Sequence, residues 1–179
     1  MARLFFLLPL LAGALLNGAQ AQDEPLGGFK AGIELRPQAT AKELGLPLYP
    51  GARPQRDDAK DKGAVTLGLW GGAFGVHLAV GKFASADGFD EVARYYRVAM
   101  AAYGEVLECR AENSGDKAPK PDRPAAKGAD DALSCKDAQP GAAGLVLKVG
   151  KPKDQRVVAL QPKGAQVHFQ LVRIEARGS

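Results

Sequence analysis

Residues 89–103 read FDEVARYYRVAMAAY, and this stretch decides the fold. Its apolar side chains recur three or four residues apart, which is typical of an α-helix with one apolar face. These side chains are Phe89, Val92, Ala93, Tyr96, Ala99, Met100 and Tyr103. Ser85 and Asp87 are candidate N-caps, and Gly104 suits the end, so we predict a helix over residues 87–103. A helix with one apolar face, or stripe, needs a sheet to pack against.

The segments before this helix alternate between apolar and polar residues, as half-buried strands do. Residues 29–36, FKAGIELR, form one strand that Pro37 ends. Residues 65–70 and 74–83 form two more, joined by a glycine turn at Gly71 and Gly72. We expect their apolar sides to face the core. Before them, residues 40–43 form a capping box for one helical turn that Gly45 closes.

The segments after the helix predict four short strands, at residues 105–109, 145–149, 156–161 and 166–174. Turns at 151–154 and 162–164 make the last three an antiparallel meander. In the last strand, Arg173 and Ile174 break the alternation, as a bulge or a sheet end would. The fold class is therefore α+β, with two layers: an antiparallel sheet of about six to seven strands and one main amphipathic helix packed on it.

The first 21 residues have the pattern of a signal peptide. Arg3 supplies the positive charge, residues 4–16 are apolar, and Ala19 and Ala21 fit a cleavage site before Gln22. The apolar run is too short to span a bilayer, so we predict no transmembrane anchor. Residues 22–179 then form a single α+β domain that is periplasmic or secreted.

The chain has two cysteines, Cys109 and Cys135. In an oxidising compartment they predict one intrachain disulfide, while the alternatives of a redox pair or metal ligands lack the usual spacing and partners. Residues 110–143 contain no aromatic residue and one large aliphatic side chain, Leu133. We predict that this segment is a mobile loop tied by the disulfide.

Three segments taken together resemble an uncharacterised family of bacterial exported proteins. They are LGLPLYPGA at 44–52, FDEVARYY with YGEVLEC at 89–109, and VVALQPKG at 157–164. In that family an LPLYPGA-like segment precedes a hairpin, a "V..FY" helix and a C-terminal β-meander; this chain has Tyr95-Tyr96 where the family more often has Phe-Tyr. The resemblance implies export and the fold, and it implies no activity, catalytic residue or cofactor.

No motif in the chain specifies an enzymatic chemistry, a cofactor or a metal site. The serines do not lie in a nucleophile turn, and the aspartates at 57–61 and 130–131 lack the spacing of a calcium loop. His77 and His168 fall opposite the apolar alternation of their strands. They support the alternative hypothesis, an enzyme of unrecognised type that uses the polar sheet face around both histidines, although solvent-facing histidines are the simpler interpretation.

Residues 144–179 hold seven basic and two acidic residues, whereas the whole chain has a net charge of +4. Five basic side chains cluster near the predicted turns and could form an anion-binding patch, namely Lys148, Lys151, Lys153, Arg156 and Lys163. The competing interpretation is that they serve solubility and protect strand edges. We therefore expect a non-enzymatic binding or structural component of the cell envelope. Its partner would be an anionic envelope polymer or a protein rather than a nucleic acid.

Overall fold

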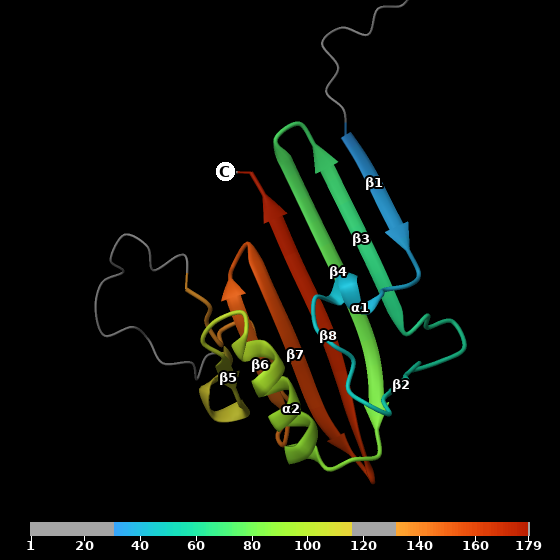
Figure 1. Ribbon diagram of the computed structural model, residues 1–179, viewed down its shortest axis with the longest axis vertical. Coiled ribbons are helices and arrows are strands. Elements are labelled where there is room, and N and C mark those ends of the chain that lie inside the picture. The colour runs from blue at the N-terminus through green and yellow to red at the C-terminus, as the bar shows by residue number, and fades with distance from the viewer. Residues whose placement is uncertain (1–30, 116–131, 179) are drawn as a thin grey trace, which may run out of the picture.

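An antiparallel sheet of eight strands forms the body of the protein (Figure 1). The structure is a computed structural model that describes residues 31–115 and 132–178. Seven strands follow the order β1-β3-β4-β8-β7-β6-β5, and β2 pairs with β4 beside this path. The strands are β1 Ala31–Arg36, β2 Arg53–Pro54, β3 Ala64–Gly71, β4 Phe74–Ser85, β5 Leu107–Cys109, β6 Leu145–Lys151, β7 Asp154–Lys163 and β8 Gln166–Arg177. The predicted α+β class is confirmed, although no pattern in the residues predicted the two-residue β2.

Helix α2, Phe89–Ala101, is the predicted amphipathic helix and packs across β6, β7 and β8 (Figure 1). It buries Val92, Ala93, Tyr96 and Met100 of the predicted stripe. The predicted N-caps are wrong, because Gly88 occupies the N-cap position. Ser85 Oγ instead accepts a hydrogen bond from the Asp87 backbone.

The short helix α1, Ala41–Leu44, has the predicted capping box at Thr40 and ends at Gly45 in the left-handed conformation. The segment that follows inserts Leu46 and Tyr49 into the core beside Leu44. The Tyr49 backbone N–H donates to the Tyr96 hydroxyl at 3.2 Å. This segment thereby fixes α1 against β4 and β8 (Figure 1).

The cross-strand register shows which side chains share a face of the sheet, because directly paired residues point the same way. The face under the helices carries the main core, with Phe83, Phe169, Leu171, Val158 and Leu147. The opposite face carries a smaller cluster, in which Cys109, Cys135 and Ala138 pack with Val146. The sheet is therefore covered on both sides at β5, β6 and β7.

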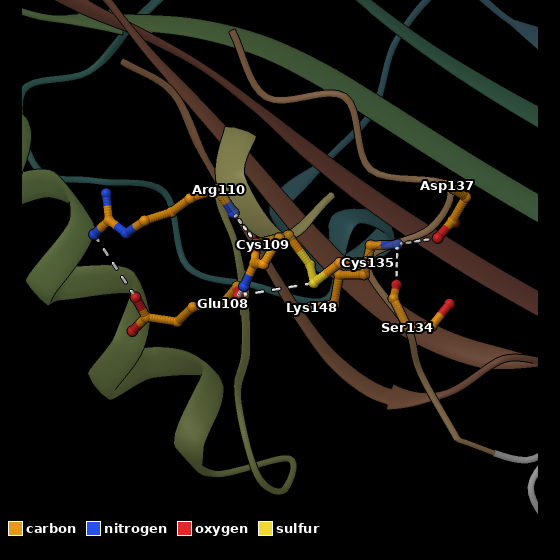
Figure 2. Close-up of a disulfide and its surroundings, with 8 residues drawn as sticks. Glu108, Cys109, Arg110, Ser134, Cys135, Asp137 and Lys148 are labelled. Atoms are coloured by element: carbon orange, nitrogen blue, oxygen red, sulfur yellow. Dashed lines mark hydrogen bonds and ion pairs between the residues drawn. A yellow bond between two sulfur atoms is a disulfide. The ribbon is translucent and has the colours of Figure 1, made fainter. Parts of the chain in front are cut away.

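The disulfide joins Cys109 of β5 to Cys135, as predicted (Figure 2). Beside it, the buried Lys148 of β6 donates hydrogen bonds to the Ser134 carbonyl and to Asp137. Residues 132–143 are thus held against β6. Of the predicted loop, the described ends include a short 3-10 helix, Ala111–Asn113, while residues 116–131 lie outside the described part of the chain.

The expectation that the apolar sides of the first strands face the core is wrong. Leu78 and Val80 of β4 pair with Ile174 and Val172 of β8, whereas Ala79 and Gly81 lie on the helix side. The reason is that Leu171 and Arg173 of β8 point toward the helices. Their cross-strand partners in β4, Gly81 and Ala79, must therefore point the same way, which turns Leu78 and Val80 to the opposite face. The apolar residues of β1 and β3 continue the same outward-facing surface.

The predicted break in the last strand is also wrong. Strand β8 runs without interruption to Arg177, and Arg173 continues the inward phase of Phe169 and Leu171. The residue that seemed to break the pattern is a buried arginine, with its side chain 9% exposed.

Within the described residues, no helix is long and apolar enough to cross a bilayer. The predicted signal peptide at 1–21 lies outside the described residues and stays a prediction.

Candidate functional site

Two arginines lie side by side on the helix-bearing face of the sheet, where the helices no longer cover it. Arg156 of β7 and Arg173 of β8 are direct cross-strand partners. They line a hollow of about 490 Å³ between α1 and strands β4, β7 and β8. Its wall also includes Thr40, Lys42, Glu43, Gly45, His77 and Glu175.

Arg173 is held by two carboxylates and still has a spare donor. Its Nη2 donates to Glu175 Oε1 at 2.5 Å and lies 2.8 Å from Asp154 Oδ1. The hydrogen bond from Arg173 holds the pKa of Glu175 below its ordinary value. Arg173 Nη1 is buried and has no hydrogen-bond partner among the described residues. Such an orphaned donor is costly, since it has lost water without gaining an acceptor.

Arg156 has a different set of neighbours. Its Nε donates to the Gly45 carbonyl at 3.0 Å, and its guanidinium lies 3.6 Å above the Tyr103 ring. Within the described chain, no carboxylate lies close enough to Arg156 to form an ion pair. Partial burial and the nearby Arg173 charge together lower the pKa of Arg156. Arg156 is therefore a cation of this hollow that has no ion pair among the described residues, as is Lys42 on the wall.

Gly45 allows the end of α1 to approach both arginines. It has φ +66°, and an added Cβ would lie 3.1 Å from Arg156 Nε and 3.3 Å from Arg173 Cδ. A side chain there would therefore crowd the arginines as well as strain the backbone. The Leu44–Leu46 segment, anchored in the core on either side of Gly45, thus sets the position of Arg156.

The structure does not bring the two histidines together. His77 lies on the helix-bearing face, in the arginine hollow, with Nδ1 3.5 Å from Glu175 Oε2. His168 pairs with Ala84 and lies on the opposite face, with Gln166 and Gln170. An active site that uses both imidazoles on one face is incompatible with this register.

The five residues of the predicted anion patch also do not share one surface. Lys148 is buried on the disulfide side, whereas Arg156 is on the helix-bearing side. Lys163 lies at the opposite end of β7, nine residues beyond Asp154, or about 30 Å along the strand. Lys153 donates to the Gly178 carbonyl, and Lys151 is exposed near the β6–β7 turn. Of the five, Arg156 alone lines the hollow.

Sequence reasoning missed Arg173, the partner of Arg156. The signal was present, because Arg173 falls exactly two residues after Leu171 in the inward phase of its strand. A charged residue in an inward position indicates a buried ion pair or a binding site.

One other polar cluster, around Lys82, already has its partners. Asp57 and Asp61, in the loop between β2 and β3, both bind Lys82 Nζ, at 2.5 and 2.9 Å. Residues 31–115 and 132–178 contain no group of three or more side chains arranged to hold a metal ion.

Comparisons with protein-family models, with curated proteins and with solved structures gave no match to this chain. The resemblance to an exported family therefore stays a prediction.

Proposed function

We propose that this protein is an exported, non-enzymatic binding component of the bacterial cell envelope, and that the Arg156–Arg173 hollow receives an acidic group of its ligand. The proposal rests on two arginines that are cross-strand partners. Arg156 forms no ion pair among the described residues, and the buried Nη1 of Arg173 has no hydrogen-bond partner among them. A carboxylate or phosphate is the chemical group that suits such a pair, because guanidinium groups bind it through two parallel hydrogen bonds.

The charges in the hollow favour a small acidic group over a long polyanion. Asp154 and Glu175 already neutralise Arg173, and Glu43 is occupied by Arg36 and Thr40. The cations left without an ion pair in the hollow are Arg156 and Lys42, so a small acidic group can be accommodated next to Arg156. An anionic polymer would bind by presenting one such group at a time.

The alternative hypothesis of an enzyme gains little support. It relied on His77 and His168 acting together, and these lie on opposite faces of the sheet. We therefore propose binding rather than catalysis.

Thermal unfolding with added inorganic phosphate or acetate tests the binding proposal. At ten times its Kd, an anion bound to the native state adds about 1.4 kcal/mol of stability and raises Tm by about 3 °C. Sodium chloride at matched ionic strength corrects for screening. We expect the Tm rise in the unaltered protein and no rise in Arg156→Gln.

Lys163→Gln is the matched control, because it removes the same charge at the other end of β7. This variant should keep the anion response. Equal responses in all three proteins, or no response in any, would contradict a site at Arg156.

Export is tested separately by expressing the full chain with its own N-terminus in a Gram-negative host. We expect release by osmotic shock and a mature N-terminus at Gln22. A full-length protein retained in the cytoplasm would contradict this part of the proposal.

A further inference from the structure

The face of the sheet opposite the helices carries a broad apolar surface on strands β1, β3, β4 and β8. We call it the open face. Cross-strand pairing sets its side chains in rows, such as Leu35–Leu67–Leu78–Ile174 and Ile33–Leu69–Val76–Ala176. Its members are Ile33, Leu35, Val65, Leu67, Leu69, Phe74, Val76, Leu78, Val80, Val172, Ile174 and Ala176.

No described residue of the open face is fully buried, although several lie at the centre of the sheet. Ile33, Leu35 and Phe74 are 78%, 67% and 56% exposed. Both described α-helices pack on the other side of the sheet. Residues 132–143 lie on the same side as the open face, but they cover only its neighbouring strands, β6 and β7. The disulfide-tied segment thus ends where the open face begins.

The open face is about as large as the largest apolar patch of a typical monomer, and such a patch is often a functional surface. Four strands spaced about 4.8 Å apart and seven residues of about 3.3 Å give roughly 19 by 23 Å, or a little over about 400 Å² in projection. Apolar patches of this size on soluble proteins often mark interaction sites.

We propose that a second copy of this chain covers the open face, so that two sheets pack face to face about a twofold axis. A twofold interface places each patch against itself, so a charge near the axis would meet its own copy. The open face meets this requirement, because it contains no charged side chain. The lysines nearest to it lie at one end of its rim, where Asp57 and Asp61 neutralise Lys82, and Lys60 and Lys62 line the same end beside Val65 and Val80.

Two facing copies would bury about 800 Å² in projection, and more in accessible area because the side chains form ridges. This is near the lower limit for a specific interface, about 1,000 Å². We therefore expect a reversible dimer whose dissociation constant lies in the micromolar range.

Sedimentation velocity of the exported protein, from about 1 to 200 µM, tests the proposal. We expect a monomer–dimer equilibrium. In Ile33→Lys/Leu35→Lys, four lysines would enter the apolar interface without partners, and Kd should rise by at least about tenfold. Both positions are on an exposed edge strand, so the fold should persist, which circular dichroism and Tm will verify.

Val98→Lys is the matched control, because Val98 is 71% exposed on the outer side of α2. It should dimerise like the unaltered protein. A monomer throughout the concentration range, or a dimer lost in Val98→Lys but kept in the double variant, would overturn the proposal. Binding of a monomeric protein to phosphatidylcholine or phosphatidylglycerol vesicles would instead assign the open face to a lipid surface.

Discussion

Arg97 and Glu108 connect helix α2 to strand β5 by a two-point ion pair. Arg97 Nε donates to Glu108 Oε1 at 2.6 Å, and Nη2 donates to Oε2 at 3.1 Å. Both side chains are about one third exposed, so solvent weakens the pair. The hydrogen bonds from Arg97 hold the pKa of Glu108 below its ordinary value.

Glu108→Gln should therefore lower the free energy of unfolding by about 1 kcal/mol at pH 7. A carboxyl group whose pKa is lower in the folded state stabilises the fold above its unfolded pKa of about 4.3, and this contribution is lost as the pH falls. The difference between the variant and the unaltered protein should shrink as the pH is lowered from about 5 to 3. Urea unfolding at both pH values measures it.

Glu105→Gln provides the control for this prediction, because Glu105 forms no ion pair within the described residues. It should have little effect at either pH. A difference for Glu108→Gln that does not change with pH would show that the charge of Glu108 does not contribute.

Single residues also show why parts of the site could not be predicted. The capping box at Thr40 and Gly45 is a local pattern, and the structure confirms it. The contact of Gly45 with Arg156 joins residues 111 positions apart. Because no local pattern encodes such a contact, the sequence predicted the turn but not the arginine hollow that it closes.

At the scale of elements, the spacing of the apolar residues predicted whether a segment is a helix or a strand. It was a poorer guide to which side of the segment packs against the core. In a helix, one apolar stripe also identifies the side that packs, so α2 could be placed on the sheet. In a strand, alternation shows which residues share a face, but not which face is covered. Strands β1, β3 and β4 alternate as clearly as β8, yet their apolar sides form the open face.

The two sides of helix α2 offer a direct test of its packing. Val92 is fully buried against the core, and Val98, on the same helix, is 71% exposed. Val92→Asp would bury an unpaired charge and should lower the free energy of unfolding by at least about 3 kcal/mol, with a correspondingly large drop in Tm. Val98→Asp should change stability by no more than about 0.5 kcal/mol.

Thermal melts followed by circular dichroism compare these two variants. A cooperative melt of Val92→Asp at the unaltered Tm would show that α2 does not pack on the sheet. An equally large loss in Val98→Asp would show that the outer side of α2 is also covered.

At the scale of the whole molecule, the sheet has two apolar clusters on opposite faces, and they depend on different supports. The larger cluster lies under α1 and α2 and needs no covalent link. The smaller one consists of Cys109, Cys135, Ala138 and Val146, and the disulfide is part of it. Loss of the disulfide should therefore affect one face first.

Cys109→Ala/Cys135→Ala should lower the free energy of unfolding by about 3.6 kcal/mol in the chain-entropy model, because the disulfide closes a long loop. Residues 132–143 should then exchange amide hydrogens rapidly through local opening, since Lys148 and a few small side chains are what remain to hold them. Amides of α2 and β8 should stay much better protected, because the helix-side core is intact. Hydrogen exchange with mass spectrometry tests this, and a reductant added to the variant should cause no further change. If α2 lost protection as fast as residues 132–143, the two faces of the sheet would be one cooperative unit, and the open face could not be altered without disturbing the arginine hollow behind it.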